Sequence, residues 1–320
     1  MGFAIIIIVF YHFFNNGGGT LIDKALRICF SQGYIGVDLF MVVSGLGLTF
    51  SMNKSENLKE YYLKRWVRIF PFFTFITIIE CWLISGEDFG LALLRSTTIG
   101  YWIGVPYIDW YVPAIVGLYC IYPILYFNIV KPGRYKQALT LCILTLVVSI
   151  VLNYFPLLDW KHYALLYRIP DFVMGSMMGI AIIRGYQPVY VKRFVSISSL
   201  AGIVLLVATR GYNHGVWLFQ LCLTPLYLYL LCHLFDALSS SIFKVSRMLP
   251  QVLAFFGVFT LELYRVSSSF ERLLTSEVCP KYHSLFVLLY FILSAILAYI
   301  CSILFKYIND YLYRKLKSII

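Results

Sequence analysis

The chain has 320 residues, of which 61% are hydrophobic, 18% aromatic and only 13% charged. Soluble domains contain about 45–50% apolar and about 25% charged residues, so this composition excludes an ordinary soluble protein and indicates an integral membrane protein. The formal net charge is +11, but the Lys and Arg residues fall between apolar runs. This pattern indicates membrane topology and no nucleic-acid partner.

The first apolar run, residues 2–14, is short for a membrane span. At 1.5 Å per residue it reaches about 20 Å, against a hydrocarbon core of about 30 Å. It lacks the basic start and small-residue cleavage site of a signal peptide. Two explanations stay open: the span continues into Asn15 and the glycine turn after it, or residues are missing upstream of Met1.

Later apolar runs predict an all-α fold, a polytopic membrane helix bundle of about ten transmembrane helices. No soluble domain or repeat interrupts the pattern, so we expect a single membrane-embedded domain over 1–320. After the first run, the predicted spans are 34–51, 68–85, 110–128, 138–156, 163–183, 195–210, 215–235, 250–270 and 285–306.

The distribution of positive charge predicts the orientation of the bundle. With the N-terminus inside, most Lys and Arg residues fall in inner loops, and every inner loop contributes. Cytoplasmic loops of membrane proteins carry this excess. We therefore expect both termini to be cytoplasmic, in a multi-pass protein of the cell membrane, bacterial inner or plasma membrane.

Ionisable residues inside apolar segments mark candidate functional positions, because burying a charge in a membrane is costly. His12 lies toward the outer end of the first run, and Asp38 lies about one turn into the second. Asp38 could hold the His12 imidazole in one tautomer and support the charge formed when it takes a proton. Alternatively, His12 is a packing residue bonded to a neighbouring helix.

Other polar positions have both a functional and a structural interpretation. Arg65 and Arg68, at the inner end of 68–85, could clamp phosphate or merely anchor the topology. Arg168 and Asp171 could line a cavity or neutralise each other three residues apart. Trp110-Tyr111 could form an aromatic belt at the membrane interface.

Five ordered stretches resemble the membrane-bound acyltransferase 3 family, and they cover most of the chain. They are Ala4-Ile-Ile-Ile-Ile-Val-Phe-Tyr-His12-Phe, Gly36-Val-Asp38-Leu-Phe-Met-Val-Val-Ser44-Gly45, Tyr62-Leu-Lys-Arg65-Trp-Val-Arg68-Ile-Phe-Pro71, Trp110-Tyr-Val and Arg168-Ile-Pro-Asp-Phe-Val-Met-Gly175. Any one motif is weak evidence, whereas the ordered set is specific.

The resemblance implies transfer of an acyl group, usually acetyl from acetyl-CoA, to a sugar hydroxyl of a cell-envelope glycan. It implies that His12 is the catalytic histidine and that Arg65 and Arg68 serve the acyl donor. We expect the acceptor site or cavity to be lined by Trp110, Tyr111, Arg168, Asp171 and Ser267. Expected partners are acetyl-CoA, a glycan or lipid-linked sugar and membrane lipids, with no metal and no permanently bound cofactor.

Two departures from the family pattern bear on activity. The family has an arginine at the position of Met1, so we expect the natural protein to begin upstream. Many members have a Tyr-x-x-His where this chain has Tyr264 and Ser267, and Arg265 has no assigned counterpart. A glycan or lipid-intermediate transporter or flippase, and a catalytically degenerate family member, are the alternative functions.

Overall fold

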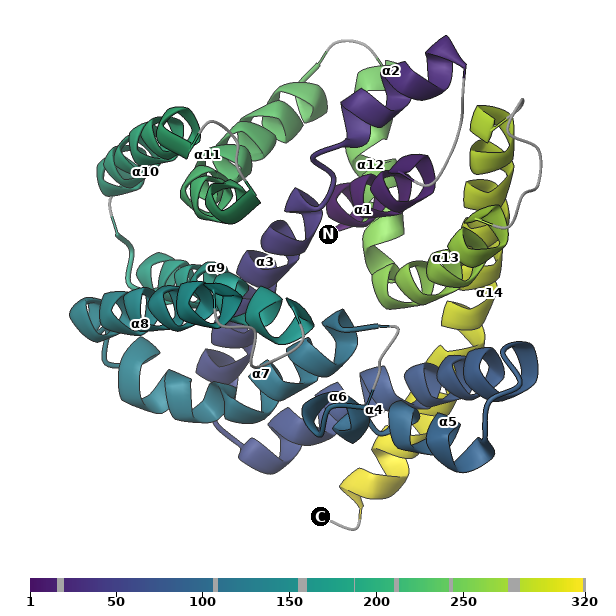
Figure 1. Ribbon diagram of the computed structural model, residues 1–320. Helices are drawn as coiled ribbons and strands as arrows, with labels where there is room; N and C mark the ends of the chain where they lie inside the picture. Colours follow the sequence, from purple (N-terminus) through teal and green to yellow (C-terminus); the bar gives the residue numbers. More distant parts are fainter. Residues whose placement is uncertain are drawn as a thin grey trace. The chain divides into compact units, whose positions relative to one another are not determined.

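A computed structural model describes residues 1–15, 20–105, 109–154, 160–186, 188–209, 213–241, 244–275 and 283–318. These ranges contain helices and no strand, which confirms the all-α prediction (Figure 1). The helices are α1 (Gly2–Asn15), α2 (Leu21–Phe30), α3 (Ile35–Lys54), α4 (Leu58–Ile78), the π-helix η1 (Ile79–Ile84), α5 (Phe89–Ser96), α6 (Ile99–Trp102), α7 (Tyr111–Leu125), the π-helix η2 (Tyr126–Val130), α8 (Tyr135–Tyr154), α9 (Trp160–Ile183), α10 (Pro188–Thr209), α11 (Asn213–Ser239), α12 (Lys244–Val258), α13 (Thr260–Thr275) and α14 (His283–Lys317).

Seven helical segments among the described residues are long and apolar enough to cross a membrane, or eight if one bent pair counts as a span. They confirm a multi-span membrane protein. The apolar helix Gly2–Phe14 is shorter than a span, as predicted. The candidates do not include α10, where 195–210 was expected to cross. A count of ten and the cytoplasmic termini therefore stay predictions.

The predicted span 250–270 is not one straight helix. Ser246–Val258 and Thr260–Glu271 meet at an angle of 79°. Phe259, at the break, is fully buried. A span over 250–270 therefore stays a prediction. The sequence could not indicate the bend, because a bend changes the direction of the chain without changing its apolar composition.

The chain divides into two compact units. The first comprises Met1–Gly36, Asn57–Val116 and Leu253–Ile320. Within it, α13 packs against α1 and α14, and α4 also packs along α14, which is yellow in Figure 1. Its buried side chains include Ile5, Phe72, Phe73, Phe259 and Leu263. The single domain over 1–320 stays a prediction.

The second unit comprises Val37–Glu56 and Gly117–Val252, in which α8 packs on α9 and α10 on α11. Helices α3 and α9 approach closely at Gly45. A Cβ atom there would lie 2.1 Å from the backbone oxygen of Phe172, so only glycine fits. This close approach brings the middle of α3 against the middle of α9.

Apolar side chains also cover the outside of several helices. On α8, Leu139, Ile143 and Leu144 are exposed, and α14 exposes a similar row. Such rows suit contact with lipid tails, because a helix satisfies its own backbone hydrogen bonds and can present apolar side chains to hydrocarbon.

Candidate functional site

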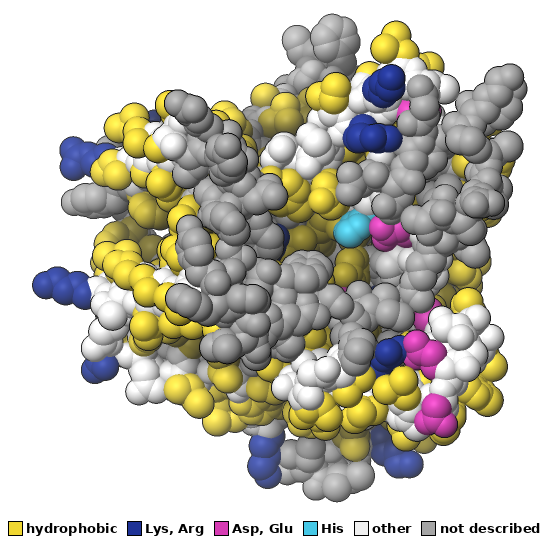
Figure 2. All heavy atoms as spheres, in the orientation of Figure 1, with side chains coloured by type: hydrophobic (Ala, Val, Ile, Leu, Met, Phe, Trp, Pro, Cys, Tyr) yellow, Lys and Arg dark blue, Asp and Glu magenta, His cyan; other side chains and the backbone are white. Residues whose placement is uncertain are grey.

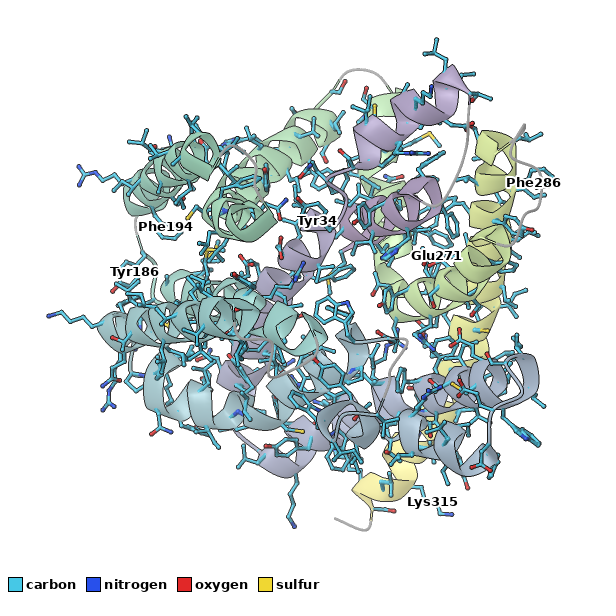
Figure 3. The ribbon with its side chains drawn as sticks, viewed as in Figure 1. Tyr34, Tyr186, Phe194, Glu271, Phe286 and Lys315 are labelled. Atoms are coloured by element: carbon cyan, nitrogen blue, oxygen red, sulfur yellow. The ribbon has the colours of Figure 1, made fainter. Side chains whose placement is uncertain are left out.

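His12 has a carboxylate partner in the first unit. Its Nδ1 atom lies 3.3 Å from Oε1 of Glu271, on α13. The His12 side chain is 46% exposed and that of Glu271 is 24% exposed. Figure 2 shows a histidine side chain against an acidic one over α1, and Glu271 is labelled between α1 and α13 in Figure 3. A carboxylate at Nδ1 fixes the tautomer and orientation of the ring.

Glu271 was not among the predicted site residues. It lies 259 residues from His12 in sequence, and nothing in the spacing of charges connects the two. Its position near the end of an apolar run was the available signal, since a carboxylate there needs a partner. The orienting role was instead assigned to Asp38, which belongs to the second unit.

The middle of α13 carries a buried ionic cluster. Arg265 is 2% exposed and pairs with Glu80 of η1, and its Nη1 atom lies 3.5 Å from Oδ2 of Asp109. The Tyr264 hydroxyl donates to Oδ1 of Asp109 at 3.0 Å, and the Ser269 hydroxyl donates to Glu80. This cluster joins η1, the start of α7 and α13.

Ser267 and the Trp110-Tyr111 pair lie close to this cluster in sequence and structure. The Ser267 hydroxyl is buried and donates to the backbone oxygen of Tyr264 at 3.0 Å. Asp109 caps α7 by accepting from the backbone of Tyr111 at 2.9 Å. The Tyr111 ring meets that of Tyr264 edge-on, with centroids 5.8 Å apart. Trp110 contacts Tyr111 in turn.

The two arginines of α4 are engaged differently. Arg68 donates to both carboxylate oxygens of Glu262, at 2.5 and 3.0 Å, and is 44% exposed while Glu262 is fully buried. Arg65 donates to the backbone oxygen of Tyr61 at 2.8 Å and stacks over that ring, 3.7 Å from its centroid. A phosphate that binds Arg68 must therefore compete with Glu262.

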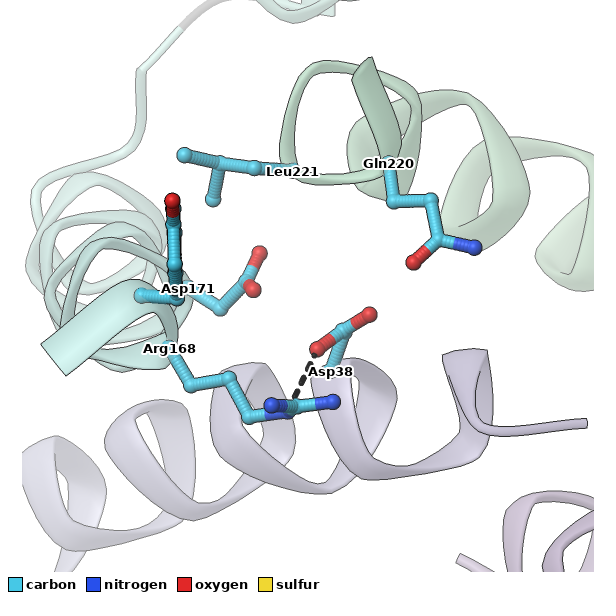
Figure 4. A pocket seen from close by; sticks show the side chains of 6 residues that line it. Asp38, Arg168, Asp171, Gln220 and Leu221 are labelled. Atoms are coloured by element: carbon cyan, nitrogen blue, oxygen red, sulfur yellow. Dashed lines mark ion pairs between the residues drawn. The ribbon is translucent and has the colours of Figure 1, made fainter. Parts of the chain in front are cut away.

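Asp38, Arg168 and Asp171 come together in the second unit. Nε of Arg168 lies 3.0 Å from Oδ1 of Asp38, and this ion pair links α9 to α3 (Figure 4). The three side chains line a small pocket of about 10 Å³ with Tyr167, Gln220 and Leu221. A water molecule needs at least about 10–15 Å³, so this pocket has room for about one water molecule or one hydroxyl group.

Asp171 is 1% exposed, and its Oδ1 atom has no hydrogen-bond partner among the described residues. Gln220 is another contributor that the sequence did not indicate, because a single amide in the apolar run 215–235 has no pattern to mark it. In the part of the chain that the structure describes, no group of three or more His, Cys, Asp or Glu side chains could hold a metal ion.

The comparisons with known proteins agree with the resemblance carried by the five motifs. A family model described as an acyltransferase domain matches residues 2–307. Neither the curated proteins nor the solved structures contain a match. The family model covers nearly the whole chain, including His12, Arg265 and Arg168 with their partners. The chain therefore belongs to the acyltransferase 3 family and is a membrane acyltransferase.

Proposed function

We propose that the chain is an O-acetyltransferase that moves acetyl from cytoplasmic acetyl-CoA to a hydroxyl of an envelope or exported polysaccharide sugar. The observation that carries this proposal is the contact between His12 and Glu271 in a chain of the acyltransferase 3 family. A half-exposed imidazole with an oriented ring is the usual general base for such a transfer.

In the proposed reaction, Glu271 holds Nδ1 of His12 and Nε2 takes the proton of the acceptor hydroxyl. The hydroxyl oxygen attacks the thioester carbonyl, an ester C–O bond forms and the C–S bond breaks. The leaving thiolate then receives the proton from His12, giving free CoA. Glu271 stabilises the imidazolium present between these two proton transfers.

Arg65 and Arg68 are proposed to bind the donor. A guanidinium binds phosphate through two parallel hydrogen bonds, and Arg68 already makes that kind of contact with Glu262. Donor phosphate would replace Glu262 at Arg68. This role follows from the family and from the half-exposed position of Arg68.

The acceptor side of the proposal uses the remaining polar residues. Arg168, Asp171 and Gln220 surround a pocket with room for about one hydroxyl group of the acceptor, and Asp38 pairs with Arg168. Trp110 and Tyr111 present aromatic faces, and Ser267 contributes to the packing around Tyr264. The proposed protein has ten spans and both termini in the cytoplasm.

The test uses membranes that contain the protein and an extract of envelope glycan. Acetyl-CoA labelled in the acetyl group is added, and label in alkali-labile ester is counted. The proposal predicts label with wild type and about 10²–10⁴-fold less with His12→Ala at equal protein level. Absence of any ester label with wild type would favour a transporter or a degenerate family member.

A further inference from the structure

Helix α2 has three distinct faces. At 100° per residue, the residues Leu21, Ile22, Ala25, Ile28 and Cys29 share one sector of about 120°. Leu21, Ile22 and Ile28 of this apolar face are 83%, 65% and 74% exposed. Lys24 and Arg27 occupy the adjoining sector and are also exposed. Figure 2 shows basic side chains over α2.

The third face fixes α2 within the first unit. Asp23 is 1% exposed, closes a capping box with Thr20 and accepts a hydrogen bond from Ser284 of α14. The Phe30 ring packs on Phe10 and Phe14 of α1, with centroids 5.0 and 5.7 Å away. These contacts fix the rotation of α2 about its own axis. Its apolar face therefore points away from α1 and α14.

The length of α2 decides how it meets a membrane. Its 10 residues reach about 15 Å, half of the hydrocarbon thickness, and a turn separates it from α3. Helices α2 and α3 lie in one candidate membrane segment, Leu21–Lys54, whose 34 residues are longer than a span needs. A short helix with an exposed apolar face beside a basic strip lies in the plane of the interface. Its apolar residues then enter the acyl boundary while the basic residues meet lipid phosphates.

We propose that α2 is an interfacial helix whose apolar face inserts at the acyl boundary and whose Lys24 and Arg27 bind the headgroups of anionic phospholipids. The positive charge of Lys24 and Arg27 is complementary to such headgroups. Helix α14 contacts α2 and contains a candidate span, Ser284–Lys317, which keeps α2 at the membrane.

The position of α2 also sets the depth of His12 in the membrane, and its meaning for acetyl transfer rests on the proposed function. Phe10 and Phe14, which flank His12 on α1, are the residues that pack on α2. His12 then lies near the headgroup level, so the acceptor hydroxyl is acetylated at the membrane surface and not at the bilayer centre.

A depth measurement tests the position of α2 independently of enzymatic activity. The full chain, with a fluorescent non-canonical amino acid at Ile28, is reconstituted in liposomes containing nitroxide lipids labelled near the headgroup or near the chain end. Matched labels at Leu144 on α8 and at Lys59 report the bilayer interior and water, since both side chains are exposed.

We expect the label at Ile28 to be quenched most strongly by the headgroup-proximal nitroxide. Stronger quenching by the chain-end nitroxide would overturn the proposal by making α2 part of a span. Quenching by aqueous iodide alone would overturn it by placing α2 in water. Protection from all three quenchers would also overturn it, because another protein surface would then cover the apolar face.

A lipid-binding measurement tests whether Lys24 and Arg27 bind anionic headgroups. Wild type and the double variant Lys24→Gln/Arg27→Gln are purified from mixed phosphatidylglycerol and phosphatidylcholine, and retained lipids are counted by native mass spectrometry. We expect the variant to retain phosphatidylglycerol on the order of tenfold more weakly. The matched variant Lys192→Gln/Arg193→Gln, an exposed basic pair on α10, should behave as wild type.

Equal loss of phosphatidylglycerol in both variants would overturn the assignment of lipid binding to α2. Loss of ester formation with normal lipid retention would count against the proposed function alone.

Discussion

Arg265 holds its positive charge in a site where its side chain is 2% exposed, and Glu80 and Asp109 are equally enclosed. Removing one partner of a buried ion pair leaves an uncompensated charge, which destabilises a protein more than the pair itself stabilises it. Single substitutions in this cluster are therefore expected to destabilise the first unit strongly.

Arg265→Met should lower the free energy of unfolding by about 3–5 kcal/mol, because Glu80 and Asp109 lose their counter-charge. Thermal unfolding in detergent measures the change. The double variant Arg265→Met/Glu80→Gln should recover part of the loss, and Arg314→Met, at an exposed position of α14, should not change stability. Unfolding of Arg265→Met at the wild-type temperature would contradict this reading of the cluster.

Glu271→Gln keeps the size of the side chain and removes the charge that supports a protonated His12. We expect acetyl transfer to fall by at least about tenfold and by no more than the roughly 10²–10⁴-fold lost with His12→Ala. Glu271→Asp, which keeps the charge, should recover part of the rate. Full activity of Glu271→Gln in the membrane assay would exclude an orienting role.

Glu262→Gln tests whether Glu262 and donor phosphate compete for Arg68. Removing the carboxylate charge should lower the KM for acetyl-CoA by up to about fivefold with little change in kcat, since Arg68 is half-exposed and such pairs contribute up to about 1 kcal/mol. Glu60→Gln, which removes the Lys64 partner on the same helix, is the control. A raised KM in Glu262→Gln would mean that Glu262 positions Arg68 for the donor.

At the scale of elements, α13 connects the parts of the first unit. Its side chains reach Arg68 of α4, Glu80 of η1 and His12 of α1. In the sequence, Glu262 and Arg265 stand as charged residues within the apolar run 250–270. The sequence could not indicate their partners, because these come from helices distant in sequence whose faces meet only after packing.

Helices α3 and α9 illustrate a contact that depends on the absence of a side chain. Gly45→Ala should destabilise the second unit by about 1–3 kcal/mol, because the new Cβ atom would clash with the Phe172 backbone. Gly47→Ala, in the same helix and with nothing within 4 Å, should instead stabilise it by up to about 1 kcal/mol. Both are measured by thermal unfolding in detergent, and equal effects would contradict the close approach.

At the scale of the whole molecule, hydropathy was sufficient to predict a helical membrane protein, and ordered motifs were sufficient to predict its family. Hydropathy and motifs can each be recognised from short stretches of sequence. The bend at Phe259 and the ion pair between Asp38 and Arg168 were not predictable in the same way. A bend leaves composition unchanged, and Arg168 had a nearer carboxylate in sequence, Asp171, than the one it pairs with.

We propose that this membrane acyltransferase uses His12 to place acetyl on an envelope glycan. The most direct measurement is ester-linked acetate on purified envelope glycans from cells that lack the gene and are complemented with wild type or His12→Ala. We expect wild type to restore the acetate and His12→Ala, present at the same level in the membrane, to leave it absent. Equal restoration by both would contradict the role of His12, and unchanged acetate with wild type would contradict the proposed reaction.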